Sequence, residues 1–315
     1  MRTRKLGSGG PDISVVGFGA WEAGGMVWGQ SPPDEQIIQA IQTSLDAGIN
    51  WIDTAEIYGN GRSEELVGAA IEGRRDQVVI ATKVAPEASG VRAEEVRLAC
   101  EGSIKRLGID HIDLFQIHWP SHNVPVEETW AALSSLVDDG LVRAIGVSNF
   151  DRELIERCER IRHVDSLQPH FSLLHPQNRD LIAWCGQQGI GVVAYGPLAF
   201  GLLTGVITAE TRFDRRDWRS GRVGMSYYPE LFAPGKLERS LTVVDALRPI
   251  AERLGMTLAQ LALAWVIHQP GVTSAIAGSR SPDHVKENAE AGDVELDQAT
   301  LDEIEALIPL GPAFA

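Results

Sequence analysis

The chain of 315 residues contains only three cysteines, Cys100, Cys158 and Cys185, and they lie far apart. No pair has the close spacing of a zinc site or a redox motif, and an odd count argues against a disulfide framework. We therefore expect three buried, reduced thiols, as in a protein of the cytoplasm, and no metal site.

Long hydrophobic runs are also absent. No apolar stretch approaches the roughly 18 residues that a membrane span requires, and the polar first residues lack the apolar core of a signal peptide. Basic residues are scarce too, because 28 lysines and arginines face 43 aspartates and glutamates, for a net charge of -15. Nucleic-acid binding needs clustered cations. The composition predicts a globular cytoplasmic protein with neither a nucleic-acid nor a membrane partner.

Short apolar runs alternate with helical patterns along nearly the whole chain. A turn cluster at residues 7–12, between two short extended pieces within 3–14, predicts an N-terminal hairpin. The eight strand-like runs that follow cover residues 15–19, 50–54, 78–84, 112–119, 144–149, 166–169, 191–198 and 273–279. Helices are predicted at residues 34–45, 63–71, 93–107, 126–137, 152–160, 178–188, 243–254 and 282–291.

Eight strand–helix units favour a closed α/β structure, the (β/α)8 TIM barrel, because parallel neighbouring strands need crossover connections. Residues 1–315 are accordingly predicted to form a single domain, of a length that such barrels commonly reach. Two parts fall outside the repeat: a long connection at 201–240, after the seventh strand, and a C-terminal amphipathic helix at 297–308. Long connections in compact domains are usually lids or binding loops.

Four titratable side chains lie at the carboxyl ends of three neighbouring predicted strands. Asp53 and Tyr58 follow the second strand, Lys83 ends the third, and His118 ends the fourth. This end of an eight-stranded barrel carries its catalytic groups. A lysine in so apolar a run needs an anionic partner, which Asp53 can supply.

A lysine cation beside a tyrosine favours the tyrosinate, so the pKa of Tyr58 is expected to fall from about 10 toward the working pH. Tyr58 would then be a usable general acid, with His118 orienting a carbonyl and stabilising the oxyanion. Taken singly, an aspartate–lysine pair is more often structural, and a histidine at a strand end is more often a core residue. Four such groups at one rim favour a catalytic site.

An ordered set of short motifs resembles the aldo-keto reductase family. The resemblance is carried by Asp53-Thr-Ala-Glu-Ile-Tyr58-Gly, Thr82-Lys83, Ile117-His118-Trp119-Pro, Ile145-Gly-Val-Ser-Asn-Phe150, Gln168-Pro, Ala194-Tyr195-Gly-Pro-Leu198 and Gly278-Ser-Arg280 with Glu287-Asn288. Each motif is weak by itself, but the ordered set, which runs from the first strand to the eighth helix, is specific.

The resemblance implies a barrel reductase with a catalytic tetrad of Asp53, Tyr58, Lys83 and His118, in which the tyrosine donates the proton. It also implies NADPH as the cofactor, with NADH possible, bound without a G-x-G-x-x-G fingerprint. By the match, Ser148, Asn149 and Gln168 hold the carboxamide, and Tyr195 stacks under the nicotinamide ring. The other cofactor-binding residues that the resemblance implies are Gly19, Gly196, Leu198, Gly201, Ser279, Arg280, His284, Glu287 and Asn288.

The end of the eighth predicted strand also has the physical character of an anion site. Ser281 and Pro282 have the character of an N-cap and a first helical position, and barrel phosphate sites often lie at a helix N-terminus here. Arg280 offers a planar fork to a 2′-phosphate, which favours NADPH. The chain departs from the family pattern at Gly196, in place of a common serine, and at His284, in place of an arginine. Arg280 is expected to compensate for the latter.

The substrate is expected to be a small carbonyl compound held in an apolar pocket. Trp21, Trp28, Trp119 and Phe150 are the candidates for the walls of this pocket. Trp218, Tyr227 and Tyr228, in the long connection, fit lid packing as well as ligand contact.

Two other classes of function stay open beside the reductase. One is a cofactor-binding regulatory subunit similar to the potassium-channel β subunits, which belong to the same family. The other is a barrel hydrolase, which should show paired carboxylates or a histidine cluster at the strand ends. The sequence does not distinguish a monomer from a homo-oligomer.

Overall fold

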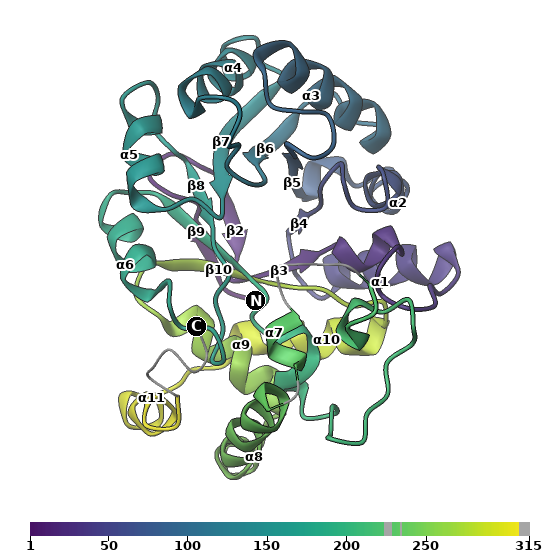
Figure 1. Ribbon diagram of the computed structural model, residues 1–315, viewed down its shortest axis with the longest axis vertical. Helices are drawn as coiled ribbons and strands as arrows, with labels where there is room; N and C mark the ends of the chain where they lie inside the picture. The colour runs from purple at the N-terminus through teal and green to yellow at the C-terminus, as the bar shows by residue number, and fades with distance from the viewer. Residues whose placement is uncertain (224–228, 234, 309–315) are drawn as a thin grey trace.

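The computed structural model describes residues 1–223, 229–233 and 235–308. Eight parallel strands close into a barrel with helices around it (Figure 1). These strands are β3 (Val16–Gly19), β4 (Trp51–Asp53), β5 (Val79–Val84), β6 (Ile112–Ile117), β7 (Val142–Ser148), β8 (Ser166–Gln168), β9 (Gly191–Tyr195) and β10 (Val272–Ala277). They follow one another in chain order, and β10 closes the ring against β3. The predicted (β/α)8 barrel is confirmed.

Helices connect each barrel strand to the next, and the last two helices follow the final strand. The α-helices of the described residues are α1 (Asp34–Asp46), α2 (Arg62–Ala70), α3 (Ala93–Leu107), α4 (Val126–Asp138), α5 (Arg152–Glu159), α6 (Arg179–Gln187), α7 (Pro229–Phe232), α8 (Lys236–Arg253), α9 (Leu258–His268), α10 (Pro282–Glu290) and α11 (Gln298–Glu305). Helix α3 is typical, because its three- and four-residue spacing puts Val96, Cys100 and Leu107 on one buried face. It ends at Gly108, whose φ of +66° suits glycine.

The predicted hairpin is present and closes the amino-terminal end of the barrel. Strands β1 (Thr3–Lys5) and β2 (Asp12–Ser14) pair antiparallel, and Ile13 packs against residues of the barrel interior. Trp51 fills that interior and donates a hydrogen bond from Nε1 to the Ser14 carbonyl at 3.0 Å. A side chain on Gly17 would meet the indole, since a Cβ there lies 2.1 Å from it. The carboxyl-terminal end of the barrel is the end at which proteins of this fold carry their functional groups.

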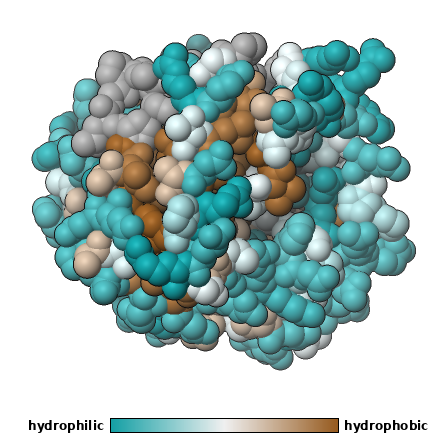
Figure 2. All heavy atoms as spheres, turned by 90° about the horizontal axis from the view of Figure 1, so that it is seen from below, coloured by the Kyte–Doolittle hydropathy of each residue, from teal (hydrophilic) through white to brown (hydrophobic). Residues whose placement is uncertain are grey.

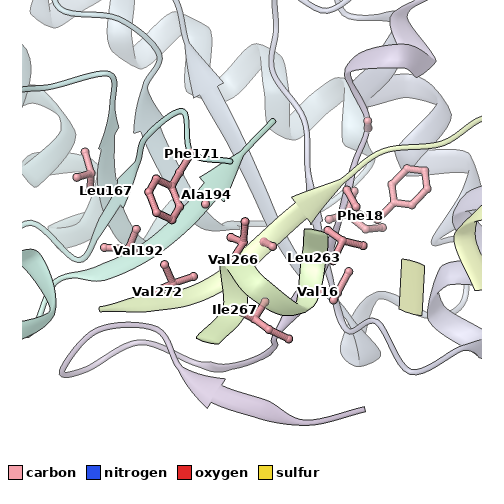
Figure 3. Close-up of a cluster of buried hydrophobic side chains, with 14 of the residues drawn as sticks. Val16, Phe18, Leu167, Phe171, Val192, Ala194, Leu263, Val266, Ile267 and Val272 are labelled. Atoms are coloured by element: carbon pink, nitrogen blue, oxygen red, sulfur yellow. The ribbon is translucent and has the colours of Figure 1, made fainter. Parts of the chain in front are cut away.

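The connection between β9 and β10 differs from the sequence prediction. One helix, at 243–254, is predicted there, but the structure contains α8, which already begins at Lys236, and then α9. Helix α9 has no polar face to reveal it, because all of its residues from Leu258 to Ile267 except Gln260 are buried. Figure 3 shows its side chains among strand residues such as Val16 and Val192. A capping box of Thr257 and Gln260 marks its start.

Several further expectations concern the surface and the thiols. Cys100, Cys158 and Cys185 are buried and unpaired, as predicted, and burial raises the pKa of each thiol to about 12. On the face seen from below, hydrophilic residues cover most of the surface and hydrophobic ones gather in a smaller area (Figure 2). Among the described helices, none alone has the length and apolarity of a membrane span. In the part of the chain that the structure describes, one pair of helices, α8 and α9, meets that test when taken together across a 92° bend.

Candidate active site

Four polar side chains meet at the carboxyl end of the barrel. Asp53 ends β4, Lys83 lies on β5, His118 directly follows β6, and Tyr58 lies between β4 and α2. Lys83 Nζ donates hydrogen bonds to Asp53 Oδ1 at 2.6 Å and to the Thr54 carbonyl at 2.8 Å. The Tyr58 hydroxyl lies 3.4 Å from Lys83 Nζ and 3.4 Å from His118 Nε2. The fold thus joins the tetrad residues in one chain of polar contacts.

The Lys83–Asp53 ion pair is almost completely removed from solvent. The lysine side chain is 0% exposed and that of the aspartate 5%. Gln168 Nε2 donates to the second carboxylate oxygen, Asp53 Oδ2, at 2.8 Å. Burial lowers the pKa of Lys83, although the charge of Asp53 opposes this effect. Such a pair is retained only when its geometry is good and its remaining polar atoms are satisfied, as they are here.

The pKa of Tyr58 shifts in the direction opposite to the one expected from the sequence. Burial raises it well above the usual tyrosine value, and the charge of Asp53 adds to the rise. The expected lowering by Lys83 is wrong, because Asp53 neutralises that cation and the buried surroundings disfavour a phenolate. Tyr58 therefore holds its proton throughout the neutral range.

His118 is neutral in this site. Burial lowers its pKa well below the usual histidine value, and the charge of Lys83 lowers it further. The ring atom Nδ1 is buried and has no hydrogen-bond partner among the described residues. A neutral imidazole carries one N–H, and an unpaired buried N–H is less tolerable than an unpaired acceptor. We therefore assign the proton to Nε2, the nitrogen that faces Tyr58.

A second cluster lies at the ends of β7, β8 and β9, beside the tetrad. Asn149 Nδ2 donates to the His118 carbonyl at 3.1 Å and to Ser148 Oγ at 3.0 Å. Its Oδ1 accepts a hydrogen bond from the Tyr195 hydroxyl at 2.8 Å. Ser148 Oγ donates to the Gln168 carbonyl at 2.9 Å. The structure thus brings together the four residues that the resemblance assigns to the nicotinamide, and it links them to the tetrad.

The residues assigned to the phosphate end lie after β10, which pairs with β9, and on α10. Arg280 Nη1 donates to the Gln30 carbonyl at 3.0 Å, which holds the guanidinium beside the loop before α1. Ser279 Oγ accepts a hydrogen bond from the Ser281 backbone N–H at 3.0 Å. Pro282 is the first residue of α10, as predicted, but the Ser281 side chain does not cap the helix.

Three further assigned residues occupy α10 itself. His284 is exposed, Glu287 is half-buried and Asn288 is buried. The Glu287 carbonyl accepts a hydrogen bond from Gln260 Nε2 of α9 at 3.4 Å. These three residues lie on the helix that begins two residues after Arg280.

The assigned residues with little or no side chain border the mouth as well. Gly19 ends β3, and Leu198 directly precedes a short 3-10 helix, Ala199–Thr204, in which Gly201 adopts a φ of +100°. Gly196 also has a positive φ, +68°, and a Cβ there would lie 2.8 Å from Cδ2 of His170. Both features disfavour the serine that is common in the family, so His170 explains this departure.

The predicted aromatic pocket divides into two groups. The Trp21 ring centroid lies 6.3 Å from that of the tetrad tyrosine and 4.8 Å from that of Trp28. Trp28 is only 5% exposed and packs at 5.9 Å against Trp218, so this pair forms the support of Trp21. Tyr227 and Tyr228 lie outside the described residues.

The other group lies on the opposite side of the mouth. Trp119 and Phe150 line a cavity of about 620 Å³, which Tyr195 borders on the barrel side. Arg152 and Trp184, which stack at 4.7 Å, border it on the side of α5 and α6. A single continuous aromatic wall is therefore not observed among the described residues.

Two features of the mouth escaped the sequence analysis. The His170 ring stacks on Tyr195 at 5.1 Å with an interplanar angle of 12°, and His175 stacks on His170 at 4.0 Å. Glu22, directly after Trp21, places a carboxylate beside Arg280. His170 directly follows Gln168-Pro, and Glu22 lies shortly after the first barrel strand, and these positions were the available signals in the sequence. Neither His170 nor Glu22 belongs to a recognisable motif.

Fold and site together define a barrel enzyme with a protonated tyrosine poised between a buried ammonium group and a neutral imidazole. This arrangement suits the donation of a proton to a substrate oxygen. A family model, Aldo/keto reductase family, matches residues 15–309. The chain belongs to this family of oxidoreductases, which act on carbonyl groups and the corresponding alcohols.

Individual relatives agree with this membership. Aldo-keto reductase YhdN of Bacillus subtilis is 34% identical over 330 residues, which cover 100% of this chain and 97% of that protein. A probable voltage-gated potassium channel subunit beta of Arabidopsis thaliana is 31% identical, with 99% and 98% covered. The structure of glycerol dehydrogenase AKR11B4 from Gluconobacter oxydans has a TM-score of 0.86 at 30% identity, with 98% of each chain covered. An aldo/keto reductase of Klebsiella pneumoniae in complex with NADP and acetate has a TM-score of 0.75 at 32% identity, with 98% and 97% covered.

Proposed function

We propose that this protein is an NADPH-dependent reductase of small aldehydes or ketones in which Tyr58 donates the proton. The observation that carries the proposal is the position of the Tyr58 hydroxyl, 3.4 Å from both Lys83 Nζ and His118 Nε2. A carbonyl oxygen near the hydroxyl and the imidazole would meet two donors at once. This is the arrangement that stabilises developing negative charge on oxygen.

Each tetrad residue has a distinct task. Tyr58 holds the proton that goes to the substrate oxygen, because burial keeps the pKa of the phenol high. His118, neutral because burial lowers its pKa, donates from Nε2 and orients the carbonyl. When Tyr58 gives up its proton, the ammonium group of Lys83 stabilises the phenolate, and Asp53 holds that ammonium group in place.

The residues around the mouth fit a nicotinamide adenine dinucleotide phosphate. Hydroxyl and amide groups of Ser148, Asn149 and Gln168 suit a carboxamide, and the Tyr195 ring suits stacking on a nicotinamide. At the other end, Arg280 beside the amino terminus of α10 suits a 2′-phosphate. When bound, the reduced nicotinamide supplies the hydride to the carbonyl carbon. The complex of the Klebsiella pneumoniae relative with NADP supports this assignment.

The other cofactor contacts and the setting complete the proposal. His284, Glu287 and Asn288 border the adenosine end, and backbone around Gly19, Gly196, Leu198 and Gly201 borders the middle of the dinucleotide. Residues 1–315 act as one catalytic domain in the cytoplasm, without a nucleic-acid or membrane partner. Trp21 and Trp119 contribute opposite walls of the substrate pocket.

The assignment of the acid is tested with Tyr58→Phe. This variant removes one oxygen atom and should lower kcat by about 10²-fold or more, because general acid catalysis typically contributes that much. NADPH affinity, measured by quenching of tryptophan fluorescence, should change by less than about twofold. The wild type, assayed with NADPH and NADH on a panel of aldehydes and ketones, provides the reference. Retained turnover in Tyr58→Phe would refute Tyr58 as the donor.

The second candidate function is that of a cofactor-binding regulatory subunit. The observation in its favour is the 31% identity to the potassium channel subunit beta of Arabidopsis thaliana. Pre-steady-state kinetics separates the two functions. A reductase should oxidise many equivalents of NADPH per site, whereas a regulatory subunit should oxidise one equivalent and then retain the product tightly.

A further inference from the structure

Glu22 is a carboxylate inside the proposed phosphate end of the cofactor site. It lies in the short helix Trp21–Gly24 that follows β3, and its Oε2 atom lies 3.5 Å from Arg280 Nε. Both side chains are 25% exposed, so water screens this pair only partly. The guanidinium also donates to the Gln30 carbonyl, and Gln36 Nε2 of α1 donates to the Arg280 carbonyl at 2.9 Å. Arg280 is therefore held in place with Glu22 as its carboxylate partner.

The charged groups around Glu22 come from three other parts of the chain. Arg280 follows β10, Arg219 and Asp217 belong to the long connection, and His284 belongs to α10. Asp217 is paired with Arg219 at 2.7 Å, so Arg280 is the neighbour most available to Glu22. Burial raises the pKa of Glu22, with a smaller rise from Asp217, while Arg280, Arg219 and His284 lower it. The raised pKa means that the carboxylate depends on its cationic neighbours to stay ionised.

The proposed function places a second anion, the 2′-phosphate, on the same guanidinium. A phosphate and a carboxylate beside one cation repel each other, and the phosphate carries the larger charge. Resting on that assignment, we propose that Glu22 is an exchangeable counter-ion that neutralises Arg280 until a 2′-phosphate displaces it, whereupon Glu22 takes up a proton from solvent. No residue of this chain loses a proton in the exchange.

Two consequences distinguish this exchange from a static ion pair. First, Glu22 weakens the binding of 2′-phosphorylated ligands and leaves other adenosine ligands unaffected, so it narrows the preference for NADPH over NADH. Second, phosphate binding draws a proton onto Glu22. Affinity for such ligands must then fall as pH rises, because a reaction that takes up protons is favoured at low pH.

The test compares two probes that lack the nicotinamide, adenosine 2′,5′-bisphosphate and 5′-AMP. They are titrated calorimetrically into the wild type and Glu22→Gln near pH 7.5, where the phosphates are almost fully ionised. Two phosphate-free buffers of different ionisation enthalpy reveal proton uptake. Glu22→Gln should bind the bisphosphate about tenfold more tightly, equivalent to one pKa unit of interaction, and bind 5′-AMP within about twofold of the wild type. The wild type should also take up more protons with the bisphosphate than the variant does.

Glu35→Gln is the matched control, because Glu35 is an exposed carboxylate in the first turn of α1, next to Gln36. It removes the same charge and should leave both affinities unchanged. If Glu22→Gln does not fold, Glu22→Ala replaces it, and the same preference for the bisphosphate over 5′-AMP is expected of Glu22→Ala. An unchanged preference for the bisphosphate, or equal proton uptake by wild type and variant, would overturn the exchange. Failure of the wild type to bind the bisphosphate would instead remove the proposed phosphate site, and the exchange with it.

Discussion

Replacing Lys83 by methionine should destabilise the fold strongly, because it leaves the Asp53 carboxylate buried without its counter-ion. At the 2.6 Å separation of the pair, an effective dielectric constant of about 20 corresponds to an attraction of roughly 6 kcal/mol. Desolvation offsets much of this attraction. Removing one partner of a buried pair nevertheless lowers the free energy of unfolding by about 3–5 kcal/mol, because the remaining charge is buried without a counter-ion.

The informative measurement is a double-mutant cycle of Lys83→Met, Asp53→Asn and the variant that carries both changes. The unfolding free energy of the wild type and of each variant is measured by urea denaturation. An asparagine oxygen can still accept the hydrogen bond from Gln168 Nε2, so the second change removes mainly charge. The double variant should therefore be more stable than Lys83→Met alone, with a coupling energy of about 3 kcal/mol. In Asp53→Asn alone, Lys83 must lose its proton on folding. The stability of that variant should rise with pH, because its unfolded state binds more protons.

An exposed pair provides the control for this cycle. Arg152 Nε and Glu156 Oε1 lie 2.8 Å apart, but both side chains are largely exposed. The cycle of Arg152→Met and Glu156→Gln should give a coupling below about 1 kcal/mol. If the Lys83–Asp53 cycle were additive within about 0.5 kcal/mol, the argument that burial makes this pair interdependent would be refuted.

Two further measurements address the tyrosine and the crowded glycine. The kcat for reduction at saturating cofactor should stay level from about pH 7 to about pH 9, because burial raises the pKa of Tyr58 and lowers that of His118, so neither group titrates there. A decline centred near pH 8 would contradict the protonated phenol. Gly196→Ser should lower the unfolding free energy by about 1–3 kcal/mol, because its φ is +68° and the His170 ring lies where the side chain would go. Gly140→Ser, with a φ of +77° but open space, should cost about 1 kcal/mol, and equal losses in the two variants would exclude the ring as a cause.

Most of the barrel was predictable because its elements have distinct periods. Helix α3 buries Val96, Cys100 and Leu107 at the spacing of one helix face, and the eight strands stand out as short apolar runs. Helix α9 was not predictable from periodicity, because barrel and neighbouring helices bury nearly all of its surface. Only the capping box at Thr257 was available as a local signal of its start.

The candidate site shows the same division. Strand ends could be recognised, so Asp53, Lys83 and His118 could be assigned to one mouth. The separation of Trp21 from Trp119 could not, because it depends on which loops each ring packs against. Glu22 and His170 belong to no motif, and their importance follows only from the groups they contact, Arg280 and Tyr195.

The sequence by itself determined which residues stand at the strand ends, because strands and turns follow from the local order of apolar and polar residues. The tertiary structure alone decided the protonation of the tetrad. From the sequence, Lys83 is expected to lie beside Tyr58 and to lower its pKa. In the folded site the pKa of Tyr58 is raised instead. The pKa responds to burial and to every charge within a few ångströms, including the Asp53 carboxylate that cancels the lysine, and these distances exist only once the barrel has closed.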